Sequence, residues 1–309
     1  MNYKKIFKSK GIRIGILKLL SFVPDKLMIK LQYRLSTGKK LNLKNPVGFS
    51  EKLQWYKLYY RNPLLKKCSD KYLVRDYISS KGLNHILVPL IGVYNSVEEI
   101  DYDKLPKSFV VKSTLGTGNN EVLVIDDFNQ VDKEQIISKI KLWKLRPIKK
   151  SVSREWGYQN KIQRIIIEEN LRTMHKSDIV DYKFFCFDGV PQYLYIITDR
   201  HKSDGPYIDI YDMAFNKLPF HRSDIKFTNK NHIMPPNFDE MIKIAKILSE
   251  DFPHVRVDLY NFSGKIYFGE LTFYNGSGYR LYEPIEYDKI VGNYFTLKRY
   301  DTKNKTSKK

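Results

Sequence analysis

Residues 255–273 read VRVDLYNFSGKIYFGELTF, and this stretch decides the fold. Two runs rich in β-branched and aromatic residues flank a short turn-forming segment that ends in Ser263-Gly264, which predicts a β-hairpin. Charged residues stand inside both runs, where a buried strand ordinarily carries apolar side chains. These charged residues are therefore the first candidates for chemistry.

The register of this hairpin decides whether its charges meet. Strand alternation puts Arg256 and Asp258 on one face of the first strand, and Glu270 on the same face as Phe268 in the second. We expect Arg256 to pair with Glu270 and Asp258 with Phe268. That register leaves 262–264 as a three-residue loop with glycine at its left-handed third position.

Two carboxylates placed as diagonal neighbours on one face repel each other unless a cation neutralises them. Asp258 and Glu270 offer only oxygen donors, with no histidine or cysteine close in sequence, and such donors suit Mg²⁺. One interpretation is therefore a magnesium site. The alternative is an ion pair between Arg256 and either carboxylate that stabilises the sheet.

A second candidate site is the glycine- and asparagine-rich loop 113–120, which separates the strand-like runs 109–112 and 121–125 and so predicts another hairpin. Small residues let backbone amides approach phosphate oxygens, and Lys112 supplies a positive charge. The loop matches neither the Walker A pattern nor a dinucleotide-binding fingerprint. An ordinary surface hairpin is the alternative.

Two further strands carry charge. Asp181 and Lys183 share one face of an aromatic-rich strand, and a lysine that faces a reacting phosphoryl group can neutralise it. The apolar run 165–167 turns acidic at Glu168 and Glu169, as the edge of a nucleobase site does. Either strand can also be an ordinary edge strand.

The remaining pattern predicts an α+β fold rather than a doubly wound parallel sheet, because runs of strands are interrupted by helices. Residues 46–100 have a helical pattern with Ser50 as the N-cap of the first helix. Elsewhere we expect helices at 130–145 and 237–249. We expect an antiparallel meander of strands at 164–169, 181–189, 193–198 and 207–211.

The chain has 309 residues and a formal net charge of +20, and that charge is concentrated at the ends. Residues 1–44 carry +11 and residues 297–309 carry +5, so the 252 residues between them carry only +4. We therefore expect no nucleic-acid groove through the body, but terminal arms held near an anionic membrane surface or an acidic polymer. Solubilising arms are the alternative.

Cysteine use and hydropathy exclude other classes of protein. Cys68 and Cys186 are too far apart for a disulfide scaffold or a zinc site of the usual spacing. No apolar run approaches the roughly 18 residues that a membrane-spanning helix needs. We expect a cytoplasmic protein whose basic segment around 12–23 contacts the inner face of the membrane or packs on the body.

Taken in order, these pieces resemble the ATP-grasp superfamily, and more closely its TupA-like branch, which is associated with teichuronopeptide and cell-surface polysaccharide biosynthesis. The resemblance covers roughly residues 45–295. It implies two α+β subdomains whose antiparallel sheets sandwich a nucleotide, preceded by a helical N-terminal region. The motifs that carry it are GFSEKLQW at 48–55, Asp70-Lys71, DYKFFCFDG at 181–189, RVDLY at 256–260 and FGELTF at 268–273.

The resemblance also implies a division of the chain. Residues 1–44 would form a basic N-terminal helical segment, and 45–107 a helical region before the main domain. Residues 108–296 would form the ATP-grasp domain, and 297–309 a basic disordered tail.

ATP and Mg²⁺ are the implied cofactors, and the family's site residues carry over onto matching positions. Lys71 and Lys112 would contact the phosphates, and Arg256 and Lys183 would act on the reacting groups. Asp258, Glu270 and Thr272 would hold the metal, although the family often has asparagine at the position of Thr272; Asn275 lies nearby. The remaining nucleotide contacts implied are Ser113, Gly116 and Gly118 in the loop, Glu168, Glu169 and Leu171 at the adenine hinge, and Asp181.

The implied reaction is attack of a carboxylate on the γ-phosphate of ATP, followed by capture of the acylphosphate by an amine. Positioning and charge neutralisation dominate such chemistry. The expected acceptor is an acidic sugar or an amino acid.

Three other functions remain open. Asp101-Tyr102-Asp103 matches the D-x-D metal motif of glycosyltransferases, although the Lys104-Leu105-Pro106 that follows favours a turn before the 109–112 strand. An ATP-grasp phosphotransferase acting on a sugar would release ADP without inorganic phosphate. A non-enzymatic scaffold would bind an anionic polymer or membrane through the basic arms.

Overall fold

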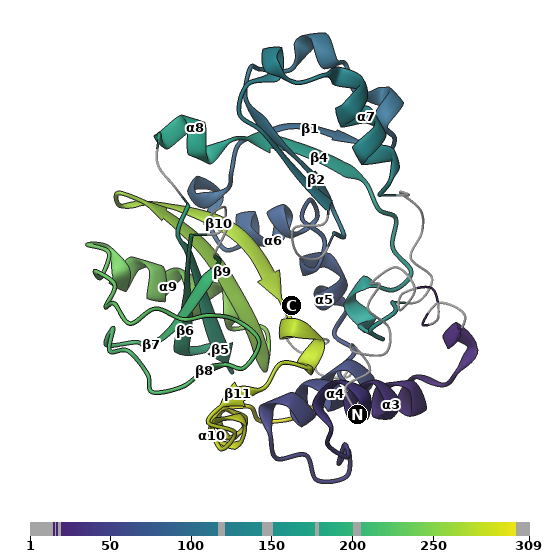
Figure 1. The fold of residues 1–309 in the computed structure, drawn as a ribbon, viewed down its shortest axis with the longest axis vertical. Helices are drawn as coiled ribbons and strands as arrows, with labels where there is room; N and C mark the ends of the chain where they lie inside the picture. Colours follow the sequence, from purple (N-terminus) through teal and green to yellow (C-terminus); the bar gives the residue numbers. More distant parts are fainter. Residues whose placement is uncertain are drawn as a thin grey trace.

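Two antiparallel sheets form the body of the protein in this computed structural model, which describes residues 15, 17, 20–116, 121–143, 151–176, 179–199 and 205–300 (Figure 1). The first sheet has the order β1 (Leu90–Tyr94), β4 (Ile165–Glu169), β2 (Phe109–Ser113), β3 (Val122–Ile125). The second has the order β10 (Lys265–Thr272), β9 (His254–Phe262), β5 (Asp181–Phe187), β6 (Val190–Thr198), β7 (Tyr207–Asp212). Each pair of neighbouring strands within these sheets is antiparallel, which confirms the predicted fold class.

Each sheet is covered by one amphipathic helix. On the four-stranded sheet, α7 (Lys133–Lys141) buries Ile136 and Ile140 in a core shared with the strands. On the five-stranded sheet, α9 (Phe238–Ser249) buries an apolar stripe that the sequence predicts at helical spacing. The two sheets therefore have separate cores.

Further helices lie between and below the sheets in the view of Figure 1. Helices α5 and α6 lie between the two sheets, and their buried residues belong to the core of the five-stranded sheet. Helices α3 and α4 lie at the base. A two-stranded sheet joins β8 (His221–Arg222) to β11 (Tyr282–Glu283). The helix bounds are α3 (Asp25–Thr37), α4 (Phe49–Tyr59), α5 (Pro63–Cys68), α6 (Val74–Ser80), α8 (Leu171–His175) and α10 (Tyr287–Tyr294). The 3-10 helices that matter for the site are η4 (Tyr102–Lys104), η7 (Trp156–Tyr158) and η8 (Asn275–Gly278).

The start of α4 differs from the prediction. Ser50 does not cap the helix; the N-cap is Gly48, and the Glu51 carboxylate accepts from the backbone N–H of Gly48 and of Val47. Ser50 lies inside the first turn, where its backbone N–H and its hydroxyl both donate to the carboxylate of Asp288 on α10. The reason is a long-range contact: a carboxylate from another helix occupies the position that a serine side chain would otherwise fill.

The register of the β9–β10 hairpin also differs from the prediction. Its loop has two residues, because Phe262 pairs with Lys265, and a bulge at Gly269 then shifts the pairing. Phe268 lies opposite Leu259, whereas Glu270 lies opposite Asp258. The bulge therefore puts Glu270 on the face opposite to that of Phe268, so that the phenylalanine stays in the core while the carboxylate joins the charged face.

The rest of the chain follows the prediction with two differences. The hairpin β2–β3 forms as predicted, and β5, β6 and β7 form an antiparallel meander. The run 164–169, predicted as the first strand of that meander, is instead β4 of the four-stranded sheet, because it pairs with β1 and β2. Strand β1, however, lies inside the region predicted to be helical, and it completes the four-stranded sheet by pairing with β4. The segment 1–14, half of the amphipathic stretch 12–23 and the tail after residue 300 lie outside the described residues. Among the residues that are described, no helix is both long and apolar enough to cross a bilayer.

Candidate active site

The first of two charged clusters lies on the four-stranded sheet, and we call Arg75, Lys112 and Glu168 the Glu168 cluster. The Nζ of Lys112 on β2 donates to the Glu168 carboxylate on β4 at 2.6 Å. Arg75 on α6 donates to the other carboxylate oxygen at 3.3 Å and to the carbonyl of Val88 at 2.9 Å. Two cations therefore share one carboxylate, and the cluster keeps an excess positive charge.

The base of the glycine-rich loop adjoins this cluster. The backbone N–H of Lys71 donates to the carbonyl of Thr114 at 2.9 Å, and its Nζ donates to the carbonyl of Gly116 at 2.5 Å. Desolvation lowers the pKa of Lys71, while the Glu270 carboxylate partly offsets that effect. Gln163 bridges the two ends of the loop, donating to the Ser113 hydroxyl and the Glu121 carboxylate. Gly118 lies outside the described residues.

The second cluster lies on the five-stranded sheet, and we call Lys183, Arg256, Asp258 and Glu270 the Asp258 cluster. Arg256 donates to both oxygens of Asp258 at 2.7 Å, and Lys183 on β5 donates to the Oδ2 of the same carboxylate. Register explains this contact, because Lys183 lies directly opposite Asp258 in the β5–β9 pair.

Arg256 is the centre of this arrangement. Its guanidinium also donates to Glu270 at 3.1 Å, to the hydroxyl of Thr272 at 3.0 Å and to the side-chain oxygen of Asn275 at 2.6 Å. Although desolvation lowers the pKa of Arg256, the adjacent Asp258 carboxylate outweighs it and the pKa is raised. The residues predicted to hold a metal are thus held together by one arginine.

Glu270 is the exposed member of the cluster, with 38% of its side chain accessible. Desolvation raises the pKa of its carboxyl, but the positive charges of Lys71, Lys183 and Arg256 outweigh it and lower the pKa to about 2. Lys71 and Glu270 also line one small cavity of about 10 Å³, which has room for roughly one water. Lys71, beside the glycine-rich loop, and Glu270 of the Asp258 cluster therefore face the same small space, which is closed in this conformation.

In this structure Arg256 and Lys183 neutralise the carboxylates of Asp258 and Glu270. The carboxylates are therefore held in ion pairs, as the alternative to a metal site predicts. No group of three or more histidine, cysteine, aspartate or glutamate residues placed to bind a metal occurs in the described part of the chain. The donor chemistry nevertheless fits Mg²⁺, because Glu270 is ionised and partly exposed, and its neighbours Asp258, Thr272 and Asn275 offer only oxygens.

Three other residues predicted to contact the nucleotide, Glu169, Leu171 and Asp181, do not belong to either charged cluster. The Glu169 N–H donates to the carbonyl of Pro89, next to the end of β4. Leu171 begins α8, and its side chain packs in a small core with Val88 and Phe262. Asp181 is buried in β5, two residues before Lys183 and on the same face.

Sequence reasoning missed Arg75 and Gln163. Both reach the site from segments distant in sequence: Arg75 reaches Glu168 from α6, 93 positions away, and Gln163 reaches Ser113 from 50 positions away. Only their side-chain contacts give them a place in the site, and no local pattern signals those contacts.

A larger cavity of about 560 Å³ lies beside β7 and β8. Its lining combines the cationic groups of Arg222 and Lys226 with the imidazole of His221, the aromatic rings of Tyr207 and Phe227, and one carboxylate, Asp224. The segment after β10 connects it to the Asp258 cluster. Asn275 at one end of that segment accepts from Arg256, and Arg280 further along forms an ion pair with Asp224 at 2.7 Å.

The D-x-D sequence lies outside this arrangement. It forms a 3-10 turn before β2, as the turn interpretation predicts, and both carboxylates lie on the surface. Asp101 pairs with Lys104 at 2.8 Å and Asp103 lies 3.8 Å from Lys133. The motif therefore does not contribute to either charged cluster.

Comparisons with solved structures find distant likenesses among ATP-grasp ligases. The D-alanine–D-alanine ligase from Bacillus anthracis is 16% identical with a TM-score of 0.42, covering 67% of this chain and 57% of that one. The Helicobacter pylori enzyme is 14% identical with a TM-score of 0.41, covering 75% and 61%. The ATP-grasp ligase PsnB with its minimal precursor is 11% identical with a TM-score of 0.40, covering 76% and 62%.

The chain thus spans about six tenths of the length of these structures. No curated protein matches it. The model of the family described as TupA-like ATPgrasp matches residues 51–296, which include the four-stranded sheet, the five-stranded sheet and both charged clusters. The chain belongs to the TupA-like ATP-grasp family.

Proposed function

We propose that the protein is an ATP-dependent carboxylate–amine ligase that works through an acylphosphate. One observation carries the proposal: Lys71, beside the glycine-rich loop, and Glu270, on the five-stranded sheet, line the same small cavity. Lys71, a side chain suited to bind phosphate, thus faces Glu270 of the cluster suited to bind the reacting groups. The loop base and Lys71 must separate from Glu270 to admit a nucleotide, because the space holds only about 10 Å³.

The residues divide the work by their charge. Lys71 and Lys112 bind the phosphates, with Ser113, Gly116 and Gly118 in the loop that covers them. Lys183 and Arg256 neutralise the carboxylate and phosphoryl group as they approach each other. The backbone of Glu169 to Leu171 reads the adenine, with Asp181 at the same end of the site, while Glu168 holds Lys112 and Arg75 in place.

Asp258, Glu270 and Thr272 are the residues that would hold Mg²⁺, with Asn275 as a further oxygen donor. A metal held there would supply positive charge against the phosphates of the nucleotide. Arg256 must then share these oxygens, since it donates to all four side chains. Arg256 thereby sets the spacing of the carboxylates before any ligand arrives.

An acidic acceptor fits the cavity beside β8. The two cations Arg222 and Lys226 outnumber the single carboxylate of its lining, and aromatic rings of the kind that stack on sugars lie beside them. We propose that an extended acidic sugar or amino-acid acceptor of a cell-surface polysaccharide or teichuronopeptide binds there, and that the reaction takes place in the cytoplasm.

Arg222→Ala tests the acceptor site. Asp224 keeps its ion pair with Arg280, so the cavity retains that contact. We expect the KM for the acceptor to rise about tenfold, the loss of one charged hydrogen bond, and the KM for ATP to stay unchanged. A rise in the ATP KM instead would place Arg222 at the nucleotide.

The decisive experiment measures ATP binding by calorimetry with and without Mg²⁺, and then screens uronic and amino acids for amide products. The proposal expects Mg²⁺ to strengthen ATP binding in the wild type and to have little effect in Glu270→Gln. Amide formation should release ADP and inorganic phosphate together. Release of ADP without inorganic phosphate would indicate a phosphotransferase. Turnover of a sugar nucleotide would indicate a glycosyltransferase. Absence of any nucleotide binding would indicate the non-enzymatic scaffold.

A further inference from the structure

Helix α3 exposes large apolar side chains. Leu27, Leu31 and Leu35 are 59%, 47% and 38% exposed, and Phe22, just before the helix, is 81% exposed. The three leucines recur every fourth residue and so form one stripe along the helix. A stripe of this size on an outer helix is unusual for a surface that meets only water.

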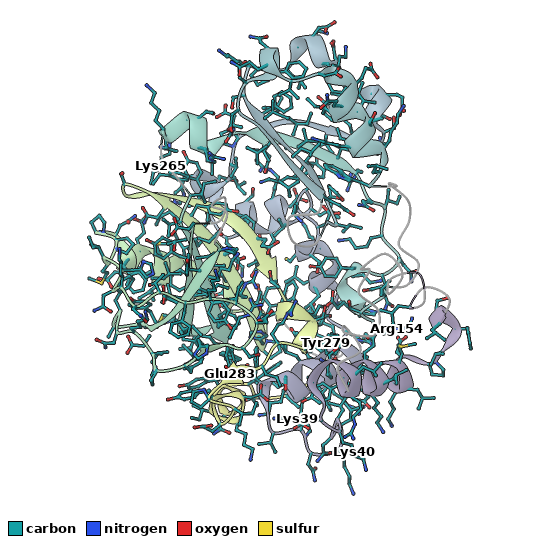
Figure 2. The ribbon with its side chains drawn as sticks, in the orientation of Figure 1. Lys39, Lys40, Arg154, Lys265, Tyr279 and Glu283 are labelled. Carbon is teal, nitrogen blue, oxygen red and sulfur yellow. The ribbon has the colours of Figure 1, made fainter. Side chains whose placement is uncertain are left out.

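The opposite face of the helix is fixed to the body. Met28, Ile29 and Tyr33 are buried. Gln32 donates to the carbonyl of Val152 at 2.9 Å and accepts from the hydroxyl of Tyr279 at 2.7 Å, and Figure 2 shows Tyr279 beside this helix. The helix cannot rotate to bury its leucines without losing these contacts. The stripe is therefore a permanent outer surface.

Basic residues accompany the stripe. Residues 20–47 contain six lysine or arginine residues and one acid, Asp25, which lies 3.7 Å from the Nε of Arg154. The basic side chains are exposed, and Figure 2 shows Lys39 and Lys40 projecting below α3, away from the body. The residues in question are Lys26, Lys30, Arg34, Lys39, Lys40 and Lys44.

We propose that the surface formed by α3 and its flanking residues docks on an anionic lipid membrane. It is defined by Phe22, Leu27, Leu31 and Leu35 together with the six basic residues of 20–47, three on α3 and three after it. An interfacial helix inserts an apolar stripe to the level of the lipid acyl chains and keeps its basic residues among the headgroups. Charge complementarity favours this partner over a second copy of the chain. A symmetric dimer through the same surface would bring twelve positive charges together with two acids.

The proposal is independent of the ligase chemistry. It places the protein at a lipid surface whatever its acceptor is, and it predicts that Glu270→Gln binds membranes as the wild type does. Lipid-linked or membrane-bound acceptors would then be concentrated near the active site.

Vesicle co-sedimentation with the full chain tests the docking surface. We compare vesicles of phosphatidylcholine alone with vesicles that also contain phosphatidylglycerol. The wild type should bind the anionic vesicles, and binding should weaken as salt is added. Reversal of two charges in Lys30→Glu with Arg34→Glu should weaken binding by roughly thirtyfold or more, since each basic contact near an anionic surface contributes about 1 kcal/mol.

A second variant separates insertion from charge. Leu27→Gln, Leu31→Gln and Leu35→Gln together keep the charge and use residues that favour helices. They should also reduce binding, with thermal unfolding confirming that the fold persists. The matched control is Lys243→Glu with Lys246→Glu, an equal charge change on exposed positions of α9, which should leave binding unchanged.

Three results would overturn the proposal. One is equal binding to neutral and anionic vesicles. Another is an equal loss in the α9 control, which would mean that net charge alone drives association. The third is a wild-type dimer in sedimentation velocity that the leucine variant converts to a monomer, which would make the α3 surface a contact between copies of the chain.

Discussion

The two charged clusters use the same kinds of residue but differ in balance and burial. In the Glu168 cluster two cations share one carboxylate, and Lys112 and Arg75 are half-buried. In the Asp258 cluster two cations match two carboxylates, and Lys183, Arg256 and Asp258 are buried. The Glu168 cluster therefore attracts anions, whereas the Asp258 cluster is already neutral.

This difference in balance and burial predicts that one cluster matters mainly for nucleotide binding and the other mainly for folding stability. Removing a half-buried cation from the Glu168 cluster should cost little folding free energy, because the carboxylate of Glu168 keeps a second cation as its partner. Removing one member of a buried, balanced cluster leaves a charge without a partner in a region of low dielectric. Variants of the two clusters should therefore fail in different ways.

Asp258→Asn should produce the largest effect. It leaves Arg256 and Lys183 with only Glu270 to neutralise them, so we expect a loss of about 3–5 kcal/mol in the free energy of unfolding. Urea unfolding followed by circular dichroism measures this loss. Ligase activity should also be lost, because the carboxylate that positions Arg256 and Lys183 has gone.

A second substitution sharpens this result. Adding Lys183→Met to Asp258→Asn removes one of the unpaired cations and should restore part of the lost stability, while activity stays absent. A loss below about 1 kcal/mol in Asp258→Asn, the scale of an exposed ion pair, would contradict the comparison.

Lys112→Met should have the opposite profile. Glu168 keeps Arg75, so we expect a change in unfolding free energy below about 1 kcal/mol. ATP binding should weaken by about tenfold to a hundredfold, the loss of one hydrogen bond to a charged group. Calorimetry measures the affinity. Lys107→Met is the control, since this exposed lysine pairs with Asp127 beside the same sheet; an equal loss of affinity there would remove Lys112 from the site.

The sequence was sufficient to predict most helices and strands and to single out most of the charged side chains of the two clusters. Alternation correctly placed Asp181 and Lys183 on one face, and β-rich runs with turn residues correctly predicted the β2–β3 hairpin. Both inferences rest on local geometry, which sequence encodes directly. The roles of these residues toward ATP and Mg²⁺ stay predictions.

The rest could not be predicted because it depends on tertiary contacts. Ser50 has the chemistry of an N-cap, but Asp288 from α10 takes over that function, which a local pattern cannot reveal. Arg75 joins Glu168 only in the folded chain, because α6 brings it there from 93 positions away in sequence. Strand β1 reads as part of a helical region, and its pairing with β4 makes it a strand.

The bulge at Gly269 gives the smallest predicted effect and tests how the Asp258 cluster is assembled. A Cβ at this position would lie 3.1 Å from the carbonyl oxygen of Asp258 and 3.3 Å from the ring of Tyr260. Such contacts are tight, so Gly269→Ala should cost about 1 kcal/mol in unfolding free energy. Because the bulge turns Glu270 toward the charged face, activity should fall by more than the loss of folded protein explains.

Gly38→Ala provides a matched control for this variant. Gly38 ends α3 with a φ of +74° and has open space around it, so alanine there destabilises through the backbone alone and by a similar amount, about 1 kcal/mol. Activity per folded molecule should be unchanged in Gly38→Ala and reduced in Gly269→Ala. If both variants keep full activity, the position of Glu270 does not depend on the bulge. The balance of the Asp258 cluster would then come from the contacts of Arg256 rather than from the register of the hairpin.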